Sequence, residues 1–165
     1  MAVEARKSSL ITNADEVPAV LNNPRVDGGF ERAKIATVAV TNGDSIASTY
    51  RLFRVPSNAV MTDLRVYCPA ITTAVTNIGV YRTEKDGSAV VDADLFTSAQ
   101  ALTSALNGVD VLHESAVFSL ANSGKELWDA LGLTSDPSVF YDVTMTLTAA
   151  AGATGTVKVI GRYTA

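Results

Sequence analysis

The chain has 165 residues, of which 47% are hydrophobic and 18% are charged, and its formal net charge at pH 7 is −4. This length suits one domain, and this composition is typical of a globular protein rather than a disordered one. No apolar run reaches the roughly 18 residues of a membrane span, and no Lys/Arg cluster forms a basic patch, so neither a membrane nor nucleic acid is an expected partner.

Residues 1–30 show no helical or strand periodicity, because breaker residues such as Pro18 and Pro24 interrupt them. A short helical turn is predicted near Ala14–Val20, limited by Pro18. The start lacks the basic-then-apolar pattern of a signal peptide, so we expect a mature protein that begins near Met1 and is made in a cytosol. The segment is predicted to be an extended N-terminal arm.

This arm is richer in apolar side chains than a solvated tail would be. Residues 1–34 carry five basic and five acidic side chains, whereas the rest of the chain carries eight and twelve. We therefore predict an arm that docks on another protein; a floppy terminus is the alternative. The candidate partner-binding residues are Leu10, Ile11, Val17, Val20, Leu21 and Val26.

From residue 31 the pattern changes to β-branched residues and period-2 alternation, which is typical of strands. The first strands are predicted over Ala33–Thr41, Ser48–Val55, Val60–Cys68 and Thr76–Thr83. Cys68 lies in phase with Leu64 and Val66, which predicts a buried core thiol, and a single cysteine excludes an internal disulfide.

The middle of the chain is less regular. There, Val90–Thr97 is predicted as a short strand or loop, Ser98–Ala105 as one or two turns of helix, and Val109–Leu112 and Ser115–Leu120 as strands. The chain is predicted to close with a hairpin of two strands, Val139–Thr148 and Thr156–Tyr163, around a glycine-containing turn.

One helix is predicted between Ser123 and Gly132. Ser123 and Glu126 fit a capping box, and Gly132 supplies a left-handed stop. Within this helix Trp128 is interpreted as a core anchor. Seven or eight strands with one short helix predict a mainly β fold, a β-sandwich in the form of a jelly roll, over residues 31–165.

The sequence offers little for catalysis, and no catalytic, cofactor-binding or metal site is assigned. His113 is the only histidine, and its strand neighbour Glu114 would point to the opposite face. Asp92 and Asp94 have the spacing of a weak cation-binding pair. The favoured interpretation is that these side chains cap backbone amides in a solvent-facing loop.

Several stretches resemble virion proteins of tailed bacteriophages, as a general pattern over roughly residues 32–164. These are Ile46–Val66, where a strand ends in a Val-Pro turn before a second strand, then Ile78–Tyr81 with Asp86-Gly87 and Val90–Phe96, and finally Tyr141–Leu147 followed by a Gly-rich turn and Tyr163. The resemblance implies a capsid decoration (cement) protein. Residues 1–30 match no such pattern.

This resemblance implies a compact β-sandwich on the outer capsid surface of the virion, assembled in the host cytoplasm. Such a protein bridges major capsid protein subunits and self-associates as a dimer or trimer. One alternative is a tail, fibre or head–tail junction component. Another is a carbohydrate-binding module, for which the candidate features are the threonine row Thr144, Thr146 and Thr148 and the aromatic side chains of Tyr50, Tyr67 and Tyr81. An enzyme is the least favoured class.

Overall fold

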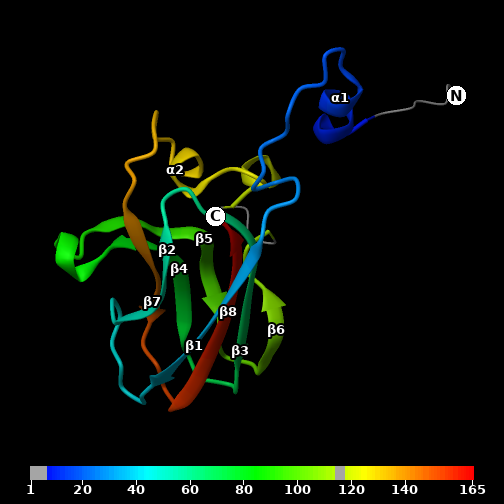
Figure 1. Ribbon diagram of the computed structural model, residues 1–165. Coiled ribbons are helices and arrows are strands. Elements are labelled where there is room, and N and C mark those ends of the chain that lie inside the picture. Colours follow the sequence, from blue (N-terminus) through cyan, green and yellow to red (C-terminus); the bar gives the residue numbers. More distant parts are fainter. Residues whose placement is uncertain (1–6, 114–117) are drawn as a thin grey trace, which may run out of the picture.

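The computed structural model describes residues 7–113 and 118–165 and folds the body of the chain into two packed antiparallel sheets (Figure 1). One sheet has the order β1 (Glu31–Val40), β8 (Gly155–Thr164), β3 (Val60–Cys68) and β6 (Leu106–Asp110). The other has the order β2 (Thr49–Pro56), β7 (Phe140–Ala149), β4 (Val75–Arg82) and β5 (Val90–Ala101). The predicted β-sandwich is confirmed.

The strands pair as β1 with β8, β2 with β7, β3 with β6, and β4 with β5. This is the pairing of a chain that is folded back on itself at β4–β5 into a two-stranded ribbon and then wound around the core. Further pairing of β3 with β8 and of β4 with β7 joins the turns of the ribbon into sheets. The jelly-roll form of the sandwich stays a prediction.

The closing hairpin was predicted wrongly, although both of its strands exist. β7 lies between β2 and β4, while β8 lies between β1 and β3 in the opposite sheet. The glycine-containing connection after β7 therefore crosses the end of the sandwich instead of reversing the chain within one sheet. A local turn pattern identifies a change of direction but does not identify the sheet that the next strand joins.

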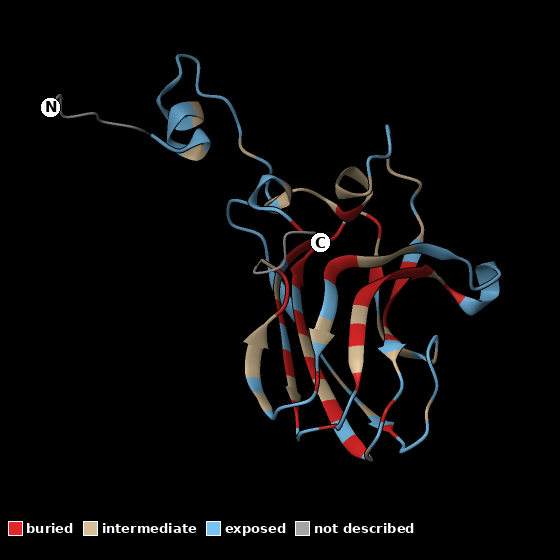
Figure 2. Cartoon of the chain, turned by 180° about the vertical axis from the view of Figure 1, so that it is seen from behind, coloured by how far each residue is buried: buried red, intermediate tan, exposed pale blue. Residues whose placement is uncertain are grey.

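Alternation along the strands builds the core between the sheets (Figure 2). On β3, the side chains of Leu64, Val66 and Cys68 are buried, while Arg65 is exposed. The predicted buried thiol is confirmed, and burial raises the pKa of Cys68 above its usual value.

The less regular middle of the chain differs from its prediction. β5 continues through Ala101, so the helix expected over Ser98–Ala105 is wrong, and β6 begins earlier than the strand expected over Val109–Leu112. Half of the strand expected over Ser115–Leu120 lies outside the described residues, and the described half forms no strand: its last residue opens a 3-10 turn, η2 (Leu120–Asn122).

A close approach of backbones explains one glycine of the second sheet. The register between β4 and β5 shifts on both sides of Gly79, so that β5 crosses directly against it. A Cβ atom at this position would lie 2.7 Å from the carbonyl oxygen of Ala93, and still closer to the backbone of Asp92. Only glycine fits here without moving the strand.

The helix expected between Ser123 and Gly132 is much shorter. α2 spans Leu127–Ala130, and its N-cap is Glu126, so the predicted capping box is wrong. Gly132 does end it, with a φ of 74° and a bond from its amide to the carbonyl of Asp129.

The core anchor of this helix was also assigned wrongly. Leu127 is the residue of α2 that enters the core, whereas Trp128 is half-buried. The Trp128 indole donates a 2.6 Å hydrogen bond to Glu126 instead. A further 3-10 turn, η1, spans Glu84–Asp86. Among the described residues, no helix has the length and hydropathy of a bilayer span.

Candidate docking surface

The arm forms a small folded unit that stands off one end of the sandwich (Figure 1). It contains α1 (Ser9–Asp15), whose N-cap Ser8 accepts a hydrogen bond from the Ile11 amide. The helical turn expected near Ala14–Val20 is therefore displaced towards the N-terminus. The arm was predicted to be extended, but part of it is helical.

The predicted partner-binding residues are mostly exposed. Val17 and Leu21 each keep 95% of their accessible surface, and Ile11 and Val20 keep about half of theirs. Leu10 is half-buried. Val26 lies against the body near Gly124, so it contributes to the attachment of the arm. The other five lie on the projecting part of the arm, and their role in binding a partner stays a prediction.

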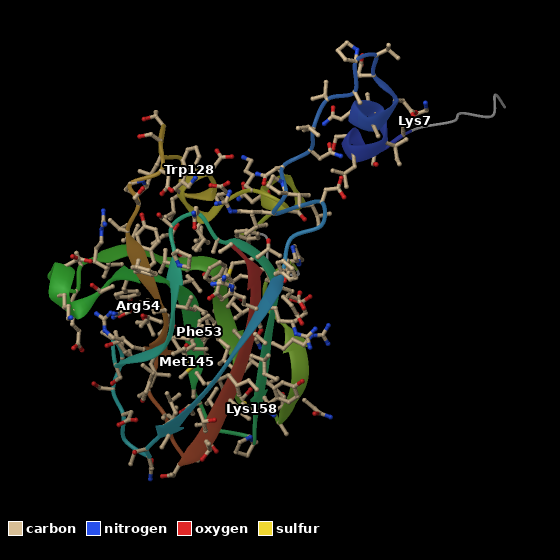
Figure 3. All side chains as sticks on the ribbon, viewed as in Figure 1. Lys7, Phe53, Arg54, Trp128, Met145 and Lys158 are labelled. Atoms are coloured by element: carbon tan, nitrogen blue, oxygen red, sulfur yellow. The ribbon has the colours of Figure 1, made fainter. Side chains whose placement is uncertain are left out.

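The root of the arm is fastened to the body by polar contacts. The Arg25 guanidinium donates a 3.0 Å hydrogen bond to the Glu126 carboxylate, which also accepts from the Trp128 indole. The hydroxyl of Thr164, at the end of β8, donates to the Arg25 carbonyl at 2.7 Å. The freely projecting part of the arm therefore ends before Arg25. Lys7 on the arm and Trp128 at its root lie towards the same end of the molecule (Figure 3).

Further apolar side chains are exposed at this arm end of the sandwich. Phe30, where the arm enters β1, keeps 88% of its surface, and Leu120 on η2 keeps 76%. Phe140 begins β7 near α2 and is also exposed. Together with the arm they place several exposed apolar side chains at one end of the molecule, as a protein-binding site would. We call the arm and these three residues the docking surface.

A charge cluster lies on the outer side of β2 and β7, apart from the docking surface. Asp142 is buried, and both of its carboxylate oxygens accept hydrogen bonds: Arg54 donates at 2.6 and 3.1 Å, and Arg51 donates at 2.8 Å. Arg51 also donates to the carbonyl of Arg82 at 3.0 Å. Arg51, Arg54 and Asp142 line an open depression of about 370 Å³, and Glu84 lines it as well. The contacts tie edge strand β2 to the sheet.

Burial of the Asp142 carboxyl raises its pKa, but the hydrogen bonds from Arg54 and Arg51 outweigh this effect, so the pKa lies below the ordinary aspartate value. Ionised Asp142 therefore stabilises the fold above the unfolded-state pKa of about 3.9, and this contribution is lost as the pH falls through the folded-state value.

We expect Asp142→Asn to lower the free energy of unfolding at pH 7 by about 1–2 kcal/mol, because the neutral amide cannot accept hydrogen bonds from both guanidinium groups. The loss is no larger because both guanidinium groups are partly exposed to solvent. Urea denaturation at pH 7 and pH 3 measures this, and the difference between variant and parent is expected to shrink at pH 3. The matched control is Asp63→Asn, which breaks an exposed pair with Arg65. A deficit as large at pH 3 as at pH 7 would contradict the assignment.

The candidate metal and catalytic residues do not form a site. The Asp92 carboxylate accepts a hydrogen bond from the Asp94 amide, so it caps backbone as expected, though within β5 rather than in a loop. Burial raises the Asp92 pKa, which disfavours the ionised form that a cation needs. Within the described residues no three His, Cys, Asp or Glu side chains group as metal ligands. The ring of His113 lies against Phe118, and Glu114 is outside the described residues.

The features proposed for carbohydrate binding are largely covered. Tyr81 is buried, and its hydroxyl shares a 2.7 Å hydrogen bond with the Thr146 hydroxyl. Thr144 is buried too, and only Thr148 of the threonine row is exposed. The ring of Tyr67 has the Lys158 ammonium 4.1 Å above its centre. No broad aromatic platform results from these residues, and Tyr50 is half-buried, with its hydroxyl bound to Asp44.

Sequence reasoning missed the residues that support the arm. In the sequence Arg25 is one charge of a balanced set, and Phe30 carries no signal because a single apolar residue beside two glycines fits many structures. The partners of Arg25 lie 101 and 139 positions further along the chain. No local pattern indicates contacts at such separation.

No known protein family and no curated protein matches this sequence. Solved structures do share its fold. A chain in the capsid asymmetric unit of cyanophage Pam1 superposes with a TM-score of 0.55 at 18% identity, covering 91% of this chain and 96% of the other. A chain in the capsid of Ralstonia phage GP4 superposes with a TM-score of 0.57 at 15% identity, covering 82% and 84%. At these identities the similarity shows a common fold.

Proposed function

We propose that this protein is a structural component of a phage virion that binds the outside of the capsid and bridges neighbouring major capsid subunits. The observation that carries this proposal is the docking surface: an arm with almost fully exposed Val17 and Leu21, at the same end of the molecule as the exposed Phe30 and Leu120. A monomer that is free in solution gains nothing from such a surface. A shared fold with chains from two phage capsid structures supports the setting.

In this proposal the arm (residues 1–30) and the sandwich (residues 31–165) have different tasks. The sandwich covers one shell subunit, and the arm reaches a second. Two linked contacts bind more tightly than either alone, because the second contact forms at high effective concentration. Copies of the protein associate as dimers or trimers on the shell. The protein is not an enzyme and needs no cofactor.

The test uses capsid shells assembled without this protein. Purified protein is expected to bind them saturably and to raise the temperature at which they break open, since it links subunits that otherwise separate. Co-sedimentation measures the binding, and light scattering during heating measures the disruption temperature. Shells that neither bind the protein nor gain heat stability would refute the proposal. Labelling of intact virions then distinguishes the capsid from the tail.

A matched pair of variants locates the contact. Leu21→Asp places a charge on the docking surface, while Ile46→Asp places one at another exposed apolar position, in the β1–β2 connection at the opposite end of the sandwich. Only the first is expected to weaken shell binding. Equal weakening by both would argue against the docking surface.

A further inference from the structure

The side chain of Asn22 joins three parts of the arm. Its carbonyl oxygen accepts a 2.8 Å hydrogen bond from the Asn13 amide group in α1. Its own amide group donates to the Asp27 carboxylate at 2.9 Å and, more weakly, to the Leu10 carbonyl at 3.4 Å. One partly buried side chain therefore links the helix to the turn that precedes β1.

Backbone hydrogen bonds reinforce the same shape. The Val20 amide donates to the Asn13 carbonyl at 3.0 Å, so the chain after α1 folds back onto the end of the helix. The Val26 and Asp27 amides both donate to the Asn23 carbonyl and close the turn before the root. Residues 8–27 are thus a folded hook rather than a loose tail.

The hook holds its shape through half-buried polar side chains, Asn13 and Asn22, while most of its apolar side chains are exposed. Val17 and Leu21 project from its surface almost wholly exposed. Next to them, Asp15 pairs with Lys7 at 2.6 Å, whereas exposed Glu16 forms no ion pair with any described residue. A partner that complements this surface offers an apolar groove with a basic side chain at its rim.

We propose that the hook is preassembled by Asn22 and enters, as a rigid piece, an apolar groove with a basic rim on a capsid subunit. The inference rests on the proposed function, because it identifies the partner as the shell. Asn22 is a positioning residue, because it holds the shape of the hook and does not itself touch the groove. A preformed element binds more tightly because less conformational entropy is lost on binding.

The decisive experiment compares Asn22→Ala with Asn107→Ala, which removes an exposed asparagine side chain from β6 on the body. In the full-length chain, Asn22→Ala is expected to weaken shell binding about tenfold while the number of binding sites per shell stays the same. Hydrogen exchange at the Val20 amide is expected to accelerate, because its hydrogen bond to the Asn13 carbonyl depends on the shape of the hook that Asn22 holds. Asn107→Ala is expected to change neither quantity.

Two further variants test the chemistry. Asn22→Asp keeps the acceptor for Asn13 but sets a carboxylate against Asp27, so its binding is expected to be at least as weak as that of Asn22→Ala. Glu16→Lys is expected to slow association several-fold at low salt, an effect that fades as ionic strength rises.

Failure of this inference differs from failure of the proposed function. If Asn22→Ala binds shells like the parent while Leu21→Asp does not, the hook is not preassembled by Asn22, yet the docking function stands. If the unmodified chain does not bind shells, the proposed function itself is refuted. Accelerated hydrogen exchange at Val20 without weaker shell binding would also overturn the inference, because the folded shape of the hook would then be irrelevant to docking.

Discussion

Replacing Gly79 with alanine is expected to lower the free energy of unfolding by about 3 kcal/mol or more. The backbone of β5 crosses the space that a Cβ atom would occupy, with the Ala93 carbonyl oxygen 2.7 Å away. A flexible side chain can rotate away from such a clash, but a strand paired with its neighbour cannot move without breaking its ladder. Leu95 and Phe96 follow directly on β5 and are buried in the core, so the shift would also disturb packing.

Urea denaturation of parent and variant measures this loss. Gly87→Ala, in the turn between the same two strands, is the matched control. A Cβ there meets nothing within 4 Å, and only its φ of 83° opposes the change, so a cost of about 1 kcal/mol is expected. Equal losses at the two positions would show that the close approach of the strands is unimportant.

Removal of residues 1–22 is expected to weaken shell binding about 100-fold and to leave the body folded. Full burial of Val17 and Leu21 in a groove contributes about 1.5 kcal/mol or more for each side chain, and every 1.4 kcal/mol is a factor of ten in affinity. The cut leaves the root contacts of Arg25 with Glu126 and Thr164 in place. Co-sedimentation with shells and the melting temperature give the two measurements.

A longer truncation serves as the comparison. Removal of residues 1–30 also eliminates the Arg25 contacts and the packing of Val26 against Gly124, so its melting temperature is expected to fall below that of the shorter truncation. A cooperative melt that is lost on removing residues 1–22 alone would show that the arm belongs to the core. Unchanged shell binding by that truncated protein would remove the arm from the docking mechanism.

The strands that are most regular in sequence were predicted best. Val60–Cys68 was identified to the residue, because over its second half the buried Leu64, Val66 and Cys68 alternate with more exposed residues. β5 was not, since its register against β4 shifts repeatedly and places Leu95, Phe96 and Thr97 in succession inside the protein. Irregular pairing erases the period on which such predictions depend.

The topology was harder to predict than the elements. The connection after β7 has the glycines of a tight turn, yet it joins two strands in different sheets. Which strands become neighbours is decided by burial of their faces and by partners far away in sequence. The same limit applies to the docking surface: composition identified the exposed apolar side chains of the arm, but not Asn22 and Arg25, whose contacts give the arm its shape and direction.

The hydrogen bond between Thr164 and Arg25 sets the exit of the arm beside the C-terminus, at one end of the sandwich (Figure 1). With that end on a shell, the connections at the other end point away from the particle. Among them, Thr103–Ala105 between β5 and β6 is exposed. Peptides inserted there would be presented outwards, so the molecule has the layout of a display scaffold, whereas a C-terminal fusion would be trapped against the shell.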